Sequence, residues 1–292
     1  MSSGTPSGSE AGPGRRCHDA VSPLHSAMYF APEPGDALTA LGLERGAMAY
    51  FAGRAAPLGA VGAGVVAATF SNFNPEHVAR HLPAAWAAAA PEAVLAARLR
   101  GADGTLRRLL RAPVLASKEV AEAAELALRA AEGCRREARP LYSANADLPV
   151  PEEPHLAMWH AATLLREHRG DGHVAALAVA GLSGIEALVL HNATGTTVTS
   201  AVLKQTRGWS EQQWAAAGDR LRERGLLDEA GEVTKTGTVL RGEVEALTDR
   251  LDAAPYDHLG SAATARLTEL AGALSRALRA AGAFPGAYFG KG

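Results

Sequence analysis

The sequence predicts a mainly α-helical protein in which a helical N-terminal domain precedes a second helical domain with a small β-wing. Alanine and other strong helix formers are abundant, and apolar residues recur every three or four positions over long stretches. Between residues 209 and 251, a helical pattern, two short extended runs around a turn, and a second helical pattern follow one another. This order of elements predicts a winged helix.

The N-terminal elements follow from turn and capping residues. The first 20 residues are rich in Ser, Gly and Pro, and they predict a disordered lead-in that lacks the apolar segment of a signal peptide. Residues 21–147 predict a helical domain. A capping residue or a proline marks several of its helical patterns, which we expect at 22–30, from 36, at 44–54, 75–86, 91–111 and 117–133.

The proline-rich run PVPEEP, residues 149–154, marks the start of the second domain at residue 148. The winged-helix domain is expected over residues 148–252. Residues 253–292 then supply a final helix, which Ser261 can cap, and a Gly-rich, aromatic tail.

Capping residues define the winged helix most clearly. Ser210 and Gln213 have the spacing of a capping box, in which each side chain accepts a hydrogen bond from a backbone amide of the other residue. Gly225 can end that helix, because glycine adopts the left-handed conformation without steric cost. Residues 228–231 have turn composition, and Thr236 can cap the helix after the wing.

Composition excludes several functional classes. The formal net charge is −2 and the isoelectric point is near 6.6, so neither a polyanion nor an anionic membrane is indicated as a partner. Cys17 and Cys134 have no metal-ligand spacing and suggest no disulfide framework, which fits a reducing cytoplasm. No phosphate-binding loop, dinucleotide fingerprint or hydrolase nucleophile motif is present, so no cofactor is expected. His77 and His81 have the i, i+4 spacing of a metal pair, but we interpret them as solvated helix histidines and expect no metal site.

The run WHAATLLREHRGDGHVAAL, residues 159–177, concentrates unusual chemistry. On a helix, His160, Thr163 and Glu167 form one polar stripe. The RGDG sequence predicts a loop that brings His173 near His168, so that two imidazoles could bind an anion or transfer protons near neutral pH. The candidate catalytic residues are therefore His160, His168 and His173. The alternative is that they are ordinary interior histidines with satisfied hydrogen bonds.

Aromatic and basic residues suggest a ligand pocket between the two domains. His25 and Tyr29 share one helix face, Tyr50 and Arg54 share another, and aromatic residues flank the loop after VVAATF. The candidate ligand-binding residues are His25, Tyr29, Tyr50, Arg54, Phe70, Phe73, Trp159 and Arg166. The alternative is that the aromatic residues simply form the core of a helical domain.

The charge of the winged helix argues against DNA recognition. Residues 207–252 contain seven basic and ten acidic side chains, whereas duplex binding depends on Lys and Arg at phosphates. In a DNA reader, the first turn of the recognition helix meets base edges, and here Glu211 would face phosphate repulsion. The residues that would contact DNA are Gln212, Gln213, Arg220 and Lys235.

Two resemblances accompany these patterns. The phrase DRLRERGLL, followed by a wing and the helix start TKTG, resembles the recognition helix and wing of MarR-type winged-helix regulators. Beyond residue 20 the chain resembles an uncharacterised helix-turn-helix family frequent in actinobacteria, through HSAMYFAPE, YFAGRAAPLG, FNPEHV and WHAATLLREHRGDGH. The second resemblance implies a helical N-terminal unit joined to a degenerate winged helix and carries no known activity.

These observations favour a cytoplasmic protein that binds a small molecule. In one version, the protein is a cofactor-independent enzyme of specialised metabolism that uses a His/Arg pocket between its domains. The alternative is a MarR-like, ligand-responsive transcription regulator, which would bind DNA as a homodimer to supply enough phosphate contacts. A third interpretation is a purely structural interaction module.

Overall fold

The computed structural model describes residues 11–195 and 199–284, and this part of the chain is helical, with no β-strand. The prediction of a mainly α protein is therefore confirmed. The N-terminal helices are α1 (Pro13–Ser26), η1 (Ala27–Phe30), α2 (Pro32–Thr39), α3 (Ala47–Ala55), η2 (Ala56–Leu58), α4 (Ala63–Phe70), α5 (Pro75–Ala79), α6 (Ala84–Ala88), α7 (Pro91–Leu115), α8 (Lys118–Glu132) and α9 (Pro140–Ala146). They are followed by α10 (Pro154–Val179), α11 (Gly184–Asn192), α12 (Ser200–Arg207), α13 (Glu211–Glu223), α14 (Lys235–Leu251), α15 (Ala254–Leu259) and α16 (Ser261–Ala280).

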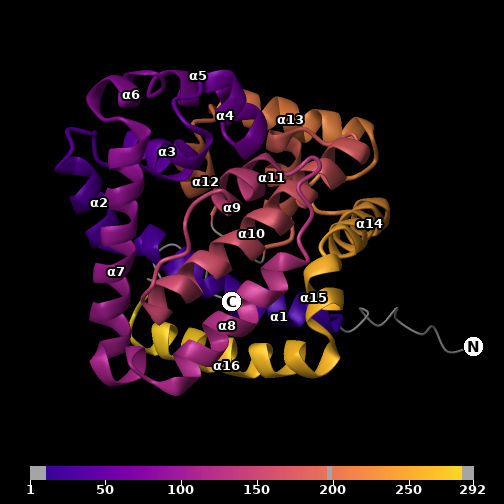
Figure 1. Cartoon of the computed structure of the whole chain (residues 1–292). Coiled ribbons are helices and arrows are strands. Elements are labelled where there is room, and N and C mark those ends of the chain that lie inside the picture. Colours follow the sequence, from indigo (N-terminus) through magenta and orange to yellow (C-terminus); the bar gives the residue numbers. More distant parts are fainter. Residues whose placement is uncertain (1–10, 196–198, 285–292) are drawn as a thin grey trace, which may run out of the picture.

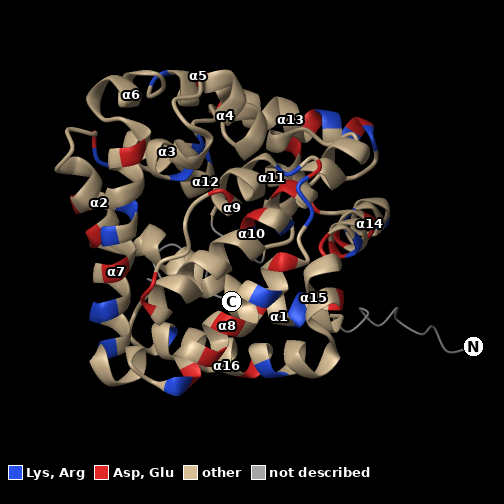
Figure 2. Cartoon of the chain, viewed as in Figure 1, with Lys and Arg blue, Asp and Glu red and all other residues tan. Residues whose placement is uncertain are grey.

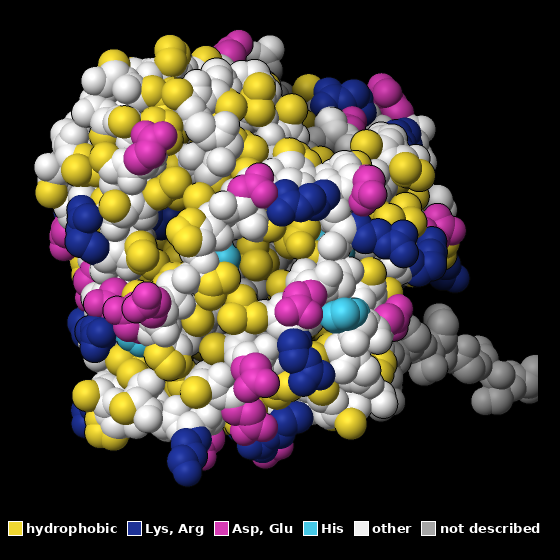
Figure 3. Space-filling model, viewed as in Figure 1, with side chains coloured by type: hydrophobic (Ala, Val, Ile, Leu, Met, Phe, Trp, Pro, Cys, Tyr) yellow, Lys and Arg dark blue, Asp and Glu magenta, His cyan; other side chains and the backbone are white. Residues whose placement is uncertain are grey.

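Helix α10 crosses the middle of the molecule, with α3–α6 and α11–α13 above it in the view, α7 at the left, α14 at the right and α16 at the bottom (Figure 1). It packs against α1, α7, α8, α9 and α14. Apolar side chains gather in the middle of the face shown in Figure 3, and charged side chains of both signs are scattered around them.

The prediction of a loop at the RGDG sequence is wrong, because residues 169–172 continue α10 without a break. Two glycines inside a helix cost about 1 kcal/mol each relative to alanine. Packing against several other helices offsets this cost, since Arg169 and Asp171 are buried within the fold. His168 and His173 consequently lie on different sides of one continuous helix rather than across a turn.

The expected disordered lead-in is too long. Helix α1 begins at Pro13, and Cys17 is completely buried where α1 packs against α10 and α16. Pro23 lies inside α1 instead of opening a later helix. Residues 1–10 of the expected lead-in lie outside the described residues.

Three apolar cores hold the helices together. The first joins α1, α8, α16 and the beginning of α10, and the second joins α2–α6 with the beginning of α7. The third joins the end of α10 to α11, α13 and α14. The boundary expected near residue 148 thus precedes a helix that contributes to the first and third cores.

Local capping signals are reproduced at some of the predicted positions. The prediction that Ser261 caps the last helix is wrong, because α16 has Gly260 at its N-cap and makes no side-chain cap hydrogen bond. Asn74, Ser117 and Ser210 each accept a hydrogen bond from the first turn of the helix that follows, and Ser210 forms the full capping box with Gln213. Helix α14 is capped by Thr234, because its hydroxyl accepts from the Gly237 amide, and the prediction of Thr236 is therefore wrong.

Two predicted elements differ in form. The helix expected over 75–86 is divided into α5 and α6, and Pro83, which has no N–H to donate, occupies the N-cap of α6. The β-wing is reduced, in the described residues, to one antiparallel bridge between Leu227 and Val233. No single helix among those described is long and apolar enough to cross a membrane.

Candidate functional site

A buried chain of hydrogen bonds links α10 to α1. The Thr163 hydroxyl donates to the Trp159 carbonyl at 2.9 Å, so its oxygen accepts from His25 Nδ1 at 2.8 Å. His25 Nε2 is then an acceptor for the Tyr29 hydroxyl at 2.9 Å. Burial lowers the pKa of His25 well below its usual value, so the imidazole is neutral at pH 7.

Glu167 is the centre of an ion-pair network next to this chain. Arg54 donates to its two carboxylate oxygens at 3.2 and 2.9 Å, and Arg166 donates to one of them at 2.7 Å. Burial would raise the pKa of Glu167, but Arg166 and Arg54 outweigh burial and hold it below its usual value. Arg54 also lies over the Phe70 ring, 4.3 Å from its centroid.

Arg98 on α7 is buried without a countercharge. Its side chain donates to the neutral Asn145 amide oxygen at 3.2 Å and lies 5.0 Å from the ring centroid of Trp159. Within the described residues, no carboxylate lies within ion-pair distance of it. Burial lowers the pKa of Arg98, although a guanidinium remains protonated at neutral pH.

The sequence analysis missed Arg98. The signal that could have found it is its spacing: it lies four residues after Val94 and three before Gly101, on the buried face of α7. An arginine on the apolar stripe of a long helix indicates either a buried ion pair or a ligand.

Arg98 lines a cavity of about 480 Å³ together with Arg54, Tyr29 and Tyr50. We call this cavity the tyrosine–arginine pocket. Its other walls include apolar residues of η1, α2 and α3: Met28, Pro32, Pro34, Leu38 and Ala49. The Tyr29 and Tyr50 rings pack with their centroids 5.4 Å apart, and Arg54 donates weakly to the Tyr50 hydroxyl at 3.5 Å.

The surroundings of this pocket carry excess positive charge. Arg207 reaches the region from α12 and lies 4.6 Å from the Phe73 ring centroid, and its Nε atom has no hydrogen-bond partner among the described residues. Among the described residues of this region, Arg54, Arg98, Arg166 and Arg207 outnumber the two carboxylates, Glu167 and Asp171. The residue types favour an anionic ligand over a metal or a cation.

The structure places three of the eight expected ligand residues in the pocket wall and the other five around it. Tyr29, Tyr50 and Arg54 line the pocket, and His25 contacts it through Tyr29. The remaining four lie around it: Phe70 and Phe73 pack against Tyr50, Trp159 stacks on His25, and Arg166 pairs with Glu167.

The three candidate catalytic histidines do not converge. His160 lies near Arg98, and burial lowers its pKa to about 4. His168 is fully buried and bonds through Nδ1 to Asp252 at 2.8 Å. His173 bonds to Thr248 at 3.0 Å in a different cavity.

Residues 207–252, which contain α13 and α14 and which we call the helix-turn-helix unit, are attached to the N-terminal helices at the start of α13. The Asn74 side chain donates to the Gly208 carbonyl at 2.9 Å and to the Gln213 amide oxygen at 3.3 Å. The Trp209 indole donates to the Asn72 carbonyl at 2.9 Å. These contacts hold residues 72–77 beside the first turn of α13.

The four DNA-contact candidates differ in availability. Gln212 and Lys235 are exposed, whereas Gln213 is engaged by the capping box and by Asn74. Arg220 forms an ion pair with Glu186 at 2.8 Å. Acidic and basic side chains mix on α13 and α14 without forming a basic stripe (Figure 2).

The helices α11, α12 and α13 follow one another and are followed by a hairpin with a single bridge and by α14, an order that suits a helix-turn-helix protein. The Helix-turn-helix family matches residues 14–285, so the chain belongs to this family. None of the curated proteins is a match, and neither is any solved structure. The predicted helix-turn-helix membership is confirmed, and the fold is of a DNA-binding type that also serves as a structural module.

Proposed function

We propose that this protein binds a small organic anion, an apolar molecule with a carboxylate, in the tyrosine–arginine pocket. The observation that carries the proposal is Arg98, which is 4 % exposed, lines the cavity and, in the part of the chain that is described, has only a neutral hydrogen-bond partner.

The energetic argument rests on the cost of burying a charge. Removing an ion from water costs several kcal/mol unless a countercharge and hydrogen bonds offset it. Asn145 and the Trp159 ring compensate Arg98 only in part. A ligand carboxylate can accept two parallel hydrogen bonds from one guanidinium, and it supplies the missing charge.

The hydroxyl groups of the pocket have different roles in this proposal. Tyr29 uses its hydrogen on His25, so its oxygen can only accept from the ligand. The Tyr50 oxygen accepts from Arg54, so its hydrogen can donate to the ligand carboxylate. Arg54 itself is matched by Glu167 and serves mainly as a wall.

An enzyme version of the proposal would transfer a proton through Tyr29 and His25. Tyr29 lines the pocket, and the neutral His25 accepts its hydrogen bond, so this pair can exchange a proton with a bound molecule. His160, His168 and His173 do not line this pocket, which makes them weaker candidates for proton transfer there.

A second candidate function, ligand-responsive DNA binding, is favoured by family membership. The acidic balance of the helix-turn-helix unit and the contact of residues 72–77 with α13 weigh against it. A protein of this charge would need a dimer to gather enough phosphate contacts.

Calorimetric titration of the full chain with aryl carboxylates tests the main proposal. We expect phenylacetate and indole-3-acetate to bind at least about 10-fold more tightly than their uncharged amides, since only the acids supply the countercharge. Arg98→Met should remove this preference. The matched control is Arg100→Met, an exposed arginine two residues later on α7, which should change nothing.

Two results would overturn the proposal: equal binding of acids and amides, or acid binding that persists in Arg98→Met. In parallel, retention of duplex DNA from the upstream region of the gene, but not of scrambled DNA, at near-physiological salt would support the regulator instead. The pocket would then be an effector site.

A further inference from the structure

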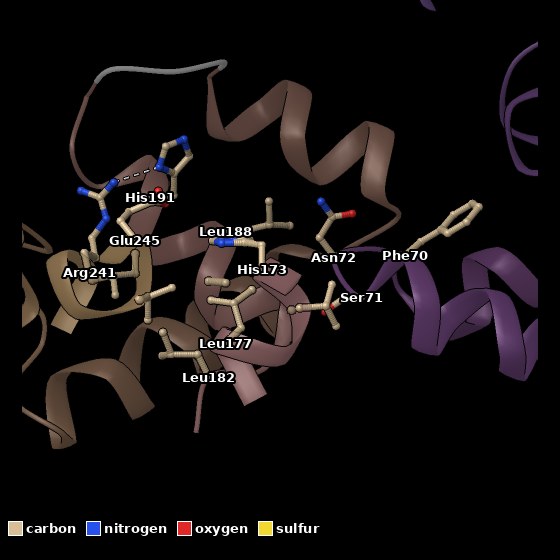
Figure 4. Close-up of a pocket in the computed structure, with 15 residues that line it drawn as sticks. Phe70, Ser71, Asn72, His173, Leu177, Leu182, Leu188, His191, Arg241 and Glu245 are labelled. Atoms are coloured by element: carbon tan, nitrogen blue, oxygen red, sulfur yellow. Dashed lines mark hydrogen bonds between the residues drawn. The ribbon is translucent and has the colours of Figure 1, made fainter. Parts of the chain in front are cut away.

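A second cavity, of about 380 Å³, lies where α10, α11 and α14 meet residues 70–72. Figure 4 shows its polar end, formed by His191, Arg241 and Glu245, with the His173 imidazole pointing toward it. The walls between the polar end and residues 70–72 are apolar and come from Val174, Leu177, Leu182, Leu188 and Val244. This cavity shares no lining residue with the tyrosine–arginine pocket.

Hydrogen bonds within the protein determine which donors and acceptors the polar end offers to a ligand. The Thr248 hydroxyl donates to the Val244 carbonyl at 2.7 Å, so it accepts from His173 Nδ1 at 3.0 Å and leaves His173 Nε2 as an acceptor. Arg241 donates to His191 Nδ1 at 3.1 Å, which leaves the His191 Nε2–H as a donor. Burial lowers the pKa of both imidazoles, so both are neutral at pH 7.

Arg241 is a cationic side chain at this end, and Glu245 is an anionic one. Glu245, one helical turn later, is bound by Arg15 and Arg169 rather than by Arg241. In the part of the chain that the structure describes, no carboxylate lies within ion-pair distance of the Arg241 guanidinium. Most of its N–H groups therefore remain available beside the neutral donor of His191.

We propose that this second cavity binds an aliphatic carboxylate. The carboxylate accepts hydrogen bonds from Arg241 and His191, and the hydrocarbon chain lies against Leu177, Leu182 and Leu188. The volume is at the lower end of the roughly 300–1,000 Å³ range of small-molecule sites. This site does not depend on the proposed function, because the two cavities use different arginines.

Titration of the full chain with three ten-carbon probes tests this proposal: decanoate, decan-1-ol and decylamine, each below its micelle concentration. Decanoate should bind at least about 10-fold more tightly than the alcohol, and the amine most weakly, because Arg241 is the cation at the polar end while Glu245 is paired with Arg15 and Arg169. Arg241→Gln should weaken decanoate about 10-fold and leave decanol unchanged. Arg250→Gln, an exposed arginine on the same helix, is the matched control.

A second variant tests the cavity itself. Leu188→Trp should fill it and weaken both decanoate and decanol, while circular dichroism and thermal unfolding report whether the fold is intact. The proposal is overturned if no probe binds, if decanoate and decanol bind equally, or if Arg241→Gln retains full decanoate affinity. Loss of decanoate binding in Arg98→Met would place the probe in the tyrosine–arginine pocket and would equally overturn it.

Discussion

Substitution of Arg98 by methionine should remove the preference for carboxylate ligands and leave the stability of the fold almost unchanged. Removing the charge relieves a desolvation cost of several kcal/mol. It also deletes one charged hydrogen bond to Asn145, about 1.5–3 kcal/mol, and a cation–π contact with Trp159, about 1–2 kcal/mol. These contributions nearly cancel. We therefore expect the free energy of unfolding to change by less than about 1 kcal/mol and the melting temperature by no more than about 4 °C.

Glu167→Gln is the comparison, because Glu167 is the carboxylate that neutralises Arg54 and Arg166. Breaking a buried pair leaves uncompensated charge, so this variant should lose about 3–5 kcal/mol. Urea denaturation of both variants, together with titration of phenylacetate, measures both effects. If Arg98→Met is destabilised by about 3 kcal/mol or more, the arginine is part of the structural framework, and the argument from its buried, unpaired charge fails.

Three further predictions concern packing, protonation and the contact at α13. Gly184→Ala places a methyl carbon 1.8 Å from the Ser71 carbonyl oxygen and should lower the free energy of unfolding by about 1–3 kcal/mol or more. Gly242→Ala, the control, has open space around the new methyl group and should raise the free energy of unfolding by about 0.5–1 kcal/mol. Urea titrations of the two variants would show equal effects if the close contact at Gly184 were absent. Burial raises the pKa of Asp171 to about 6, so the folded protein binds more protons than the unfolded chain between pH 4 and 6. Stability that is present below pH 4 is therefore lost as the pH rises to 6, by up to about 3 kcal/mol. Asp171→Asn should remove this loss, and an unchanged pH profile of stability in this variant would contradict the assignment. Asn74→Ala should lower the free energy of unfolding by about 2 kcal/mol, because it removes the helix cap and the hydrogen bonds to the start of α13. Asn74→Asp keeps the cap and should recover about half of that stability. Equal losses of stability in the two variants, measured by thermal unfolding, would show that the cap contributes nothing.

Local features of the fold were predictable from sequence because they depend on neighbouring residues. A capping box such as Ser210 with Gln213, or a cap such as Asn74 before proline, uses side chains within three positions of the helix start. The predicted RGDG loop failed because the glycine penalty is small beside the packing of α10 against several helices. Turn composition cannot report that burial.

The sequence by itself determined the helical class, several helix starts such as those of α5, α7, α8 and α13, the helix-turn-helix order and the acidic character of the helix-turn-helix unit. It also pointed to Tyr29, Tyr50 and Arg54 as candidates for one pocket. Tertiary structure alone decided that Arg98 joins them without a countercharge and that His160, His168 and His173 lie in different surroundings. The physical reason is that caps and helical periodicity are set by residues close in the chain. The environment of a buried charge is set by side chains far apart in sequence that only packing brings together.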